Sequence, residues 1–259
     1  MIPAADLRPV SRPQPAPAGA GAAARGFTLV EVAAVVLIIG LVAAISMGAF
    51  SSAFGSRDAR SAEATGKDID GALLTYARKY HHLPCPDING NSREGDASGN
   101  CATSFAMGYL PYESLELEPP ASAARAVYGV YRNAAAGADL VRPLASGTPA
   151  KPDFQRALIA AAKIAVVDDK HVFVTGDGAA TGAVDCAANR VLHPAYAIVI
   201  PVTDRDGDGS NLDGVDVGLP SSGSLCLASP NAKPRADFDD HVAFTGFTTL
   251  LGLISTDSP

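Results

Sequence analysis

The feature that most constrains this chain is an uncharged, mostly apolar run that opens directly behind a glycine and carries one acid near its start. The run begins at residues 26–31, with the sequence GFTLVE, and no charged residue occurs at 32–56. About 20 apolar residues are needed for a helix to cross a bilayer, and residues 27–50 supply that length. Backbone groups inside lipid must bond to one another, so the run is predicted to be a helix. Glu31 would cost about 2.5–3.5 kcal/mol near a bilayer centre, so an acid at this place indicates that it has a partner.

The segment before the run predicts how such a helix would be oriented. Residues 1–26 are rich in Ala, Pro and Gly, and they contain three arginines against a single acid, Asp6. This composition has neither a hydrophobic period nor a core, so it predicts a disordered cytoplasmic leader. Arginines beside a membrane helix favour the cytoplasmic side of the membrane, so the N-terminus is expected inside and everything after the helix on the outer side. A secretory signal cut at residues 44–46 is the weaker alternative, because the apolar core is too long for it.

The junction and the apolar run behind it resemble the prepilin cleavage and methylation segment of type IV pilins and type II secretion pseudopilins. In that family a membrane peptidase cuts after the glycine, which corresponds to Gly26, and the new N-terminal amine, here that of Phe27, is methylated. The resemblance also implies that Glu31 matches the family's glutamate at the fifth mature position. It is specific over about residues 25–50 and looser beyond them.

The resemblance implies a structural subunit, in a minor position, of a type II secretion pseudopilus or a type IV pilus. The partners that it implies are other pilin or pseudopilin subunits, the prepilin peptidase/N-methyltransferase, an inner-membrane assembly platform and the membrane itself. The implied location is the inner membrane as a single-pass protein, N-terminus in and C-terminus out, and then a periplasmic or surface filament. The large outer domain favours a low-copy or tip role. Three phrases lean toward secretion systems: LPCPD at 83–87, GYLPY at 108–112 and the pair Asp239-Asp240.

The expected assembly chemistry follows from the spacing of two groups. Cleavage creates an amine at Phe27, and Glu31 lies about 6 Å further along a helix that rises about 1.5 Å per residue. If the acid meets the amine of a neighbouring subunit, the two charges neutralise each other while the apolar helices pack. A buried charge that loses its partner costs about 3–5 kcal/mol. The pair is therefore expected to fix the axial register of the subunits.

Beyond the apolar run, the pattern predicts a soluble second half of the same helix over residues 51–82. Ile69, Leu73 and Ala77 recur at helical spacing and form one apolar face. Pro84 follows, and proline cannot continue the backbone hydrogen bonds of a helix. The helix is therefore expected to end before it.

Residues 83–259 are expected to fold as one globular, β-rich domain of ordinary size. Short apolar segments between Gly, Pro, Asn and Asp turns predict strands, and an Ala- and Leu-rich segment predicts a helix at 154–166. The expected strands are at residues 126–132, 171–175, 196–202 and 241–247. The predicted fold class is pilin-like α+β: a long N-terminal helix, its first half transmembrane, packed on a C-terminal antiparallel sheet.

The four cysteines all lie after the apolar run, where an oxidising compartment is expected. An even number in such a compartment indicates disulfides, and three pairings are open to four cysteines. We favour Cys85 with Cys101 and Cys186 with Cys226, because each pair closes a turn-rich stretch locally. A closed loop of roughly 15 residues contributes about 3 kcal/mol in the chain-entropy model.

An acid-rich turn at residues 204–216, with the sequence DRDGDGSNLDGVD, is the candidate metal site. Its start matches an EF-hand calcium loop, but Val215 stands where the bidentate Glu belongs, so a looser calcium turn is expected, completed by a later or distant acid. A merely acidic surface turn is the alternative, and calcium-stabilised loops in secretion pseudopilins favour calcium. A weaker candidate is the turn at 87–96, for which polar turns inside a disulfide loop are the better explanation. The candidate ligands are Asp204, Asp206, Asp208, Asp213 and Asp216.

Several function classes are disfavoured by composition and motifs. The formal net charge is −7, so nucleic-acid binding is not expected. The five histidines are scattered, and the sequence contains no HExxH, no Gly-x-Ser-x-Gly turn and no phosphate-binding Gly-rich loop, so an enzyme is not expected. The alternative to a filament subunit is a surface or periplasmic binding protein, such as an adhesin, that uses the pilin signal as an anchor and has a calcium-stabilised domain.

Overall fold

The computed structural model describes residues 28–256 except 145, 206, 222 and 236, and it leaves the side chains of 43–56 undescribed. The chain divides into two compact units, Met1–Ser51 and Ser52–Pro259. The helix α1, Leu29–Tyr80, begins in the first unit and ends in the second. The predicted leader and the cleavage pair Gly26 and Phe27 lie outside the described residues.

Helix α1 begins at Leu29 because Thr28 caps it. The Thr28 side-chain oxygen accepts a hydrogen bond from the backbone N–H of Glu31 at 3.2 Å. Its carbonyl accepts from the backbone of Glu31 and Val32 at 3.0 and 3.1 Å. Threonine followed three residues later by glutamate is the spacing of a capping box, and an acid in the first turn interacts favourably with the helix dipole. Glu31 therefore sits in a favourable place for starting the helix.

The prediction that the first half of this helix is transmembrane is wrong for the described residues. None of the helices among them is both long enough and apolar enough to cross a membrane. The predicted single-pass location in the inner membrane, N-terminus in and C-terminus out, is not supported for the same reason.

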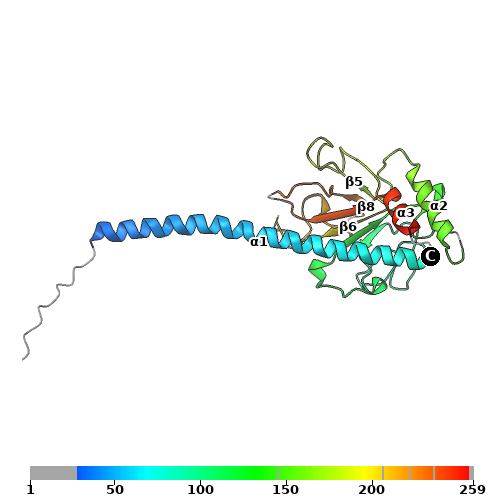
Figure 1. The fold of residues 1–259 in the computed structure, drawn as a ribbon, viewed down its shortest axis with the longest axis horizontal. Coiled ribbons are helices and arrows are strands. Elements are labelled where there is room, and N and C mark those ends of the chain that lie inside the picture. The colour runs from blue at the N-terminus through cyan, green and yellow to red at the C-terminus, as the bar shows by residue number, and fades with distance from the viewer. Residues whose placement is uncertain (1–27, 145, 206, 222, 236, 257–259) are drawn as a thin grey trace, which may run out of the picture. The chain divides into compact units, whose positions relative to one another are not determined.

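The later part of α1 packs on the sheet of the second unit, as Figure 1 shows. Ile69, Leu73 and Ala77 are buried there, so the predicted apolar face does meet a core. Asp70 adds a polar tether between the helix and two strands: its Oδ1 accepts hydrogen bonds from the hydroxyls of Tyr196 at 2.5 Å and Thr245 at 3.2 Å.

The main sheet is four-stranded and antiparallel throughout. Its strands, in the order in which they neighbour one another, are β1 (Met107–Tyr109), β2 (Val127–Val130), β6 (Tyr196–Ile200) and β8 (His241–Thr245). Tyr128 pairs with Ile198 between β2 and β6, and Ala197 pairs with Phe244 between β6 and β8.

Both faces of this sheet are covered, so β2 and β6 are buried along their whole length. Tyr128 and Ile198 belong to one core cluster, together with Leu73 of α1. Val127 and Val199, one position along each strand, belong to a second cluster under the turn-rich segments. This alternation is the period of two that a strand imposes on its side chains.

The remaining elements are short and surround this sheet. Two helices, α2 (Lys151–Ala162) and α3 (Phe247–Ser255), pack together, and both contribute buried residues to the cluster that contains Leu73. The small strands form an antiparallel pair, β3 (Arg132–Asn133) with β4 (Ala138–Asp139), and a parallel pair, β5 (Phe173–Val174) with β7 (Cys226–Leu227). Single 3₁₀ turns lie at Glu113–Leu115, Ser122–Ala124, Ala134–Ala136 and Gly214–Asp216.

Candidate functional site

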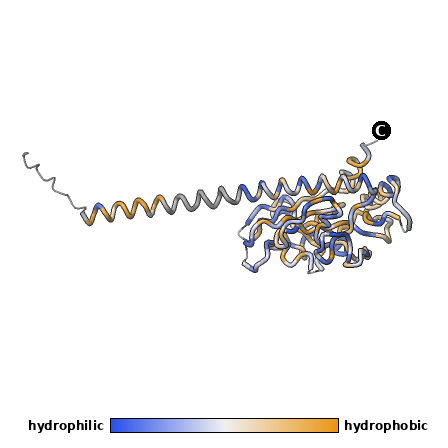
Figure 2. Tube along the Cα trace, turned by 90° about the horizontal axis from the view of Figure 1, so that it is seen from below, coloured by the Kyte–Doolittle hydropathy of each residue, from blue (hydrophilic) through white to orange (hydrophobic). Residues whose placement is uncertain are grey.

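The apolar side chains at the start of α1 are exposed, in contrast to most of those in the second unit. Leu29 is 87% and Leu37 70% exposed. The valines and isoleucines from Val30 to Val42 are each about half exposed or more. Figure 2 shows this hydrophobic stretch, which begins at the helix start. Glu31, the residue predicted to direct assembly, lies exposed in the first turn of this surface. Contiguous exposed apolar surface of this kind marks an interaction site.

The acid-rich turn is organised by its own hydrogen bonds at its exposed start. The carboxylate of Asp204 accepts the backbone N–H groups of Gly207 at 2.7 Å and Gly209 at 3.0 Å. The carboxylate of Asp208 accepts the backbone N–H of Ser210 at 2.7 Å. Both acids are exposed, and Asp206 lies outside the described residues. The EF-hand-like start of the turn is thus explained by turn formation.

The structure brings a different set of acids together. Ligand oxygens of Asp213, Asp239 and Asp240 lie within 4.8 Å of one another. Asp213 comes directly before the 3₁₀ turn Gly214–Asp216, and the other two come directly before β8. Asp240 Oδ2 accepts the backbone N–H of Asp213 at 2.8 Å, which joins the two segments.

Two of the acids in this region have a buried oxygen without a hydrogen-bond partner. These atoms are Oδ1 of Asp240 and Oδ2 of Asp216. Burial raises the pKa of Asp216 to about 7. Burial, followed by the negative charges of Asp216, Asp213 and Asp239, raises the pKa of Asp240 to about 8. A nearby cation would favour the ionised forms of both carboxyl groups.

The donors of this acidic cluster fit a calcium ion. Ca²⁺ binds carboxylate and backbone oxygens, and the cluster offers carboxylates, including one buried oxygen that nothing else satisfies. One positive side chain already lies at its edge, because Arg205 Nε donates to Asp239 Oδ2 at 2.6 Å. Asp213 and Asp216 were candidates from the sequence. Asp239 and Asp240 were not, and their adjacency ahead of a strand was the available signal.

The second, weaker candidate turn is satisfied from within. Asp87 is fully buried, and its carboxylate accepts backbone N–H groups from each residue of the segment 89–92, at 2.7 to 3.3 Å. Glu94 accepts from the hydroxyl of Tyr76 and the backbone N–H of Cys85, both at 2.7 Å. These carboxylates therefore act as structural acceptors of a polar loop.

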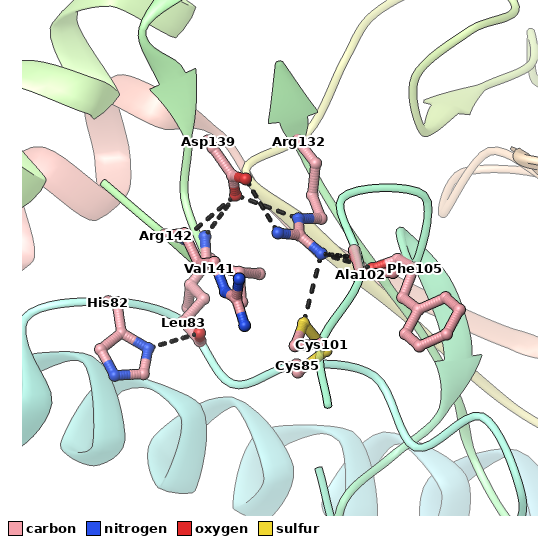
Figure 3. A network of polar contacts seen from close by, with 10 residues as sticks. All are labelled: His82, Leu83, Cys85, Cys101, Ala102, Phe105, Arg132, Asp139, Val141 and Arg142. Atoms are coloured by element: carbon pink, nitrogen blue, oxygen red, sulfur yellow. Dashed lines mark hydrogen bonds and ion pairs between the residues drawn. A yellow bond between two sulfur atoms is a disulfide. The ribbon is translucent and has the colours of Figure 1, made fainter. Parts of the chain in front are cut away.

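The disulfides join Cys85 to Cys101 and Cys186 to Cys226, which is the pairing favoured above. Figure 3 shows the first of them beside Arg132. The Arg132 guanidinium donates to Cys101 Sγ at 3.2 Å and to the carbonyls of Ala102 and Phe105. The disulfide loop is thereby attached to the β3–β4 pair.

A groove of about 400 Å³ lies beside the later part of α1, and its walls are mixed. Ile69, Tyr112 and Ile200 supply apolar surface, and Asp58 and Asp68 supply charge. Among the residues that the structure describes, the lining includes acids but no Lys, Arg or His.

No family model matches this chain, and neither a curated protein nor a solved structure matches it. The resemblance to pilins therefore rests on the residues at 25–50 and the looser phrases after them, and the function that follows from it is a proposal.

Proposed function

We propose that this chain is a minor structural subunit of a type II secretion pseudopilus or a type IV pilus, assembled through the start of α1 after cleavage behind Gly26. The single observation that carries the proposal is the exposed apolar surface of residues 29–42, with one acid, Glu31, in its first turn. A surface of this kind gains free energy when copies of the helix pack together, at about 25 cal/mol per Å² of apolar area buried.

Glu31 fixes the axial register in which neighbouring helices pack. A helix surface that is apolar on every side can slide along its neighbour, because hydrophobic contact is not directional. Glu31 paired with the amine of Phe27 on an adjacent subunit selects one axial position. Any other register leaves a charge buried without a partner, at a cost of about 3–5 kcal/mol.

Three variants of the full-length protein test this assembly role. Glu31→Ala removes the charge and is expected to abolish recovery of the subunit in sheared filaments. Glu31→Gln keeps a residue that suits the third helical position of a capping box but removes the charge, and it is expected to fail in the same way. Glu63→Ala is the matched control, because Glu63 is an exposed acid of the same helix whose ion pair with Lys67 is a surface contact.

The outcomes separate pairing from helix capping. Wild-type recovery of Glu31→Gln with loss of Glu31→Ala would show that the acid only caps the helix, and the pairing would be wrong. Recovery of both variants at the wild-type level would contradict assembly through this residue. The Glu63→Ala protein should appear in filaments at the wild-type level.

Processing has its own test, the mass of the N-terminal peptide of protein purified from cells. The expected peptide begins at methylated Phe27. An intact Met1, or a cut near Ser46, would contradict the processing class.

A second candidate function is favoured by the acidic cluster and the groove. An exported binding protein, for instance an adhesin, would use a calcium-stabilised domain to hold a recognition surface. Asp213, Asp239 and Asp240 would hold the ion, and the ion would join the turn at 204–216 to the segment before β8. Full incorporation of Glu31→Ala and Glu31→Gln in the filament test would favour this candidate over the first.

A further inference from the structure

Three side chains from separate loop positions meet beside the parallel β5–β7 pair. Asp168 and His171 come from the turn ahead of β5, and His193 comes from the segment ahead of β6. Their ligand atoms lie within 4.8 Å of one another. No other group of three or more His, Cys, Asp or Glu ligands in the described part of the chain contains a histidine.

The distances are close to those around a small metal ion. Asp168 Oδ1 lies 2.8 Å from His171 Nδ1 and 3.8 Å from His193 Nε2. Ligand atoms about 2.0–2.1 Å from a tetrahedral Zn²⁺ are separated from one another by about 3.3 Å. These two separations lie on either side of that value, and all the ligand atoms of the cluster lie within 4.8 Å of one another, so modest side-chain shifts would bring the three residues around one ion.

His193 is held in the orientation that a ligand requires. Its Nδ1 lies 2.7 Å from the carbonyl oxygen of Val172, and since a carbonyl can only accept, Nδ1 carries the proton and donates it. Nε2 is then the atom with a free electron pair, and it accepts the backbone N–H of Asp168 at 3.2 Å. A carbonyl behind the non-ligating nitrogen is the usual outer support of a metal-bound histidine.

The other two ligands are supported as well. Asp168 Oδ1 accepts the backbone N–H of Lys170 at 3.0 Å, which fixes the carboxylate. The His171 ring stacks on Tyr131 with centroids 5.1 Å apart, and the His193 ring lies against the same tyrosine at 5.2 Å. His193 is nearly buried, whereas the Asp168 side chain is 37% exposed. A solute can therefore reach the cluster from the side of Asp168.

We propose that Asp168, His171 and His193 form a three-ligand site for Zn²⁺, with the remaining position open to solvent. Two imidazoles and one carboxylate are typical zinc ligands, whereas Ca²⁺ and Mg²⁺ prefer sites made of oxygen alone. Binding replaces two hydrogen bonds by bonds to the ion: the one between His171 Nδ1 and Asp168 Oδ1, and the one that His193 Nε2 accepts from the backbone N–H of Asp168. The proton on Nδ1 of His171 moves to Nε2 of the same ring. The ion would pin the turn ahead of β5 to the segment ahead of β6.

The test is a Zn²⁺ titration of the full-length protein against a chromophoric chelator, with Ca²⁺ and Mg²⁺ in excess so that the acidic cluster of Asp213, Asp239 and Asp240 is occupied. One Zn²⁺ per chain is expected. The Asp168→Asn and His171→Gln proteins are expected to bind it at least about 10–100-fold more weakly, the loss typical even for outer-shell changes.

Two matched controls separate this site from unspecific binding. Asp169→Asn changes the adjacent acid, which pairs with Arg190 on the surface at 3.0 Å, and His82→Gln removes a histidine that bonds the carbonyl of Leu83 instead. Both are expected to bind as the wild type does. Circular dichroism of Asp168→Asn shows whether that protein is folded before its affinity is compared.

Substitution of Co²⁺ for Zn²⁺ gives a readout that reports the ligands directly. Visible d–d absorption typical of a four-coordinate ion with nitrogen ligands is expected from the wild type and lost in His171→Gln. The proposal is overturned if no stoichiometric Zn²⁺ binds, if the two ligand variants bind as tightly as the wild type, or if Asp240→Asn rather than Asp168→Asn removes the ion.

Discussion

Arg132 and Asp139 form a buried, two-pronged ion pair across the β3–β4 ribbon. Arg132 Nε donates to Asp139 Oδ1 at 3.0 Å and Nη2 donates to Oδ2 at 2.8 Å, and the side chains are only 1% and 4% exposed. Asp139 Oδ1 also accepts the backbone N–H of Val141 and Arg142 (Figure 3). The pair thus joins a strand, the following loop and the first disulfide.

Asp139→Asn is expected to lower the free energy of unfolding by about 3–5 kcal/mol, because it leaves the Arg132 guanidinium buried without its counter-charge. Urea denaturation followed by circular dichroism measures the change. Glu113→Gln is the control, since the Arg93–Glu113 pair is exposed and should change stability by no more than about 1 kcal/mol. A double variant, Arg132→Met with Asp139→Leu, should be less destabilised than Asp139→Asn. Equal losses in both variants of the buried pair would argue against an uncompensated charge.

Cys85→Ala with Cys101→Ala is expected to cost about 3 kcal/mol, because the disulfide closes a loop across a sequence separation of 16 residues. The loop contains few apolar side chains of its own, so its hydrogen bonds to Asp87 are expected to open as well. Amide hydrogen exchange at residues 89–92 should therefore quicken in the variant while β6 stays protected. Unchanged exchange at that segment would show that the Asp87 carboxylate holds the loop without the disulfide.

Asp70→Ala is expected to destabilise the second unit by about 1–3 kcal/mol, because the buried hydroxyl of Tyr196 loses its acceptor. Asp68→Ala is the matched control, since Asp68 is an exposed acid of the same helix. Adding Tyr196→Phe to Asp70→Ala removes the unsatisfied hydroxyl and should recover part of the loss. Thermal melts of the four proteins measure this, and a loss that Tyr196→Phe does not reduce would assign the effect of Asp70 to helix packing instead.

The sequence predicted those parts of the fold that depend on local pattern. Strands β2, β6 and β8 lie inside the segments expected from their apolar content, and α2 covers Lys151–Ala162 where 154–166 was predicted. The strand predicted at 241–247 is too long, because β8 ends at Thr245 and helix α3 begins at Phe247. The apolar side chains of α3 pack with α2. Over so few residues, the sequence patterns of a short amphipathic helix and a strand are hard to tell apart.

What the sequence could not predict are the clusters that tertiary contacts assemble. Asp240 reaches Asp213 because β8 is an edge of the sheet beside the acid-rich turn, and no spacing along the chain encodes this. His171 and His193 likewise appear scattered in sequence, and they meet because the segment ahead of β6 pairs with β5 through the bridge between Val174 and Leu192. The membrane span was predicted from the length of the mostly apolar run at residues 27–50, whereas none of the helices among the described residues is long and apolar enough to cross a membrane.

The acidic cluster leads to a prediction that couples pH to calcium. Asp216 and Asp240 have pKa values raised to about 7 and about 8, above the value of about 3.9 for an unfolded aspartate. At pH values between the unfolded and the folded pKa, the two carboxyl groups hold more protons in the folded state than in the unfolded state. The stability of the calcium-free protein should therefore fall as pH rises from about 4 to about 8. Ca²⁺ should reverse this loss at pH 8 and have little effect at pH 5, where both acids are protonated and cannot serve as ligands.

Thermal melts in chelator and in Ca²⁺, at both pH values, check this prediction, and two variants locate it. Asp240→Asn removes the charge without changing the shape of the side chain, so at pH 8 in chelator it should melt no lower than the wild type and should not respond to Ca²⁺. Asp237→Asn alters an exposed acid that pairs with Arg235 and should respond as the wild type does. A calcium response that survives Asp240→Asn would place the ion elsewhere. A wild-type melting temperature that rises from pH 5 to pH 8 in chelator would mean that Arg205 and the backbone N–H groups of Asp213 and Ala228 already stabilise the ionised forms of the two acids without a metal.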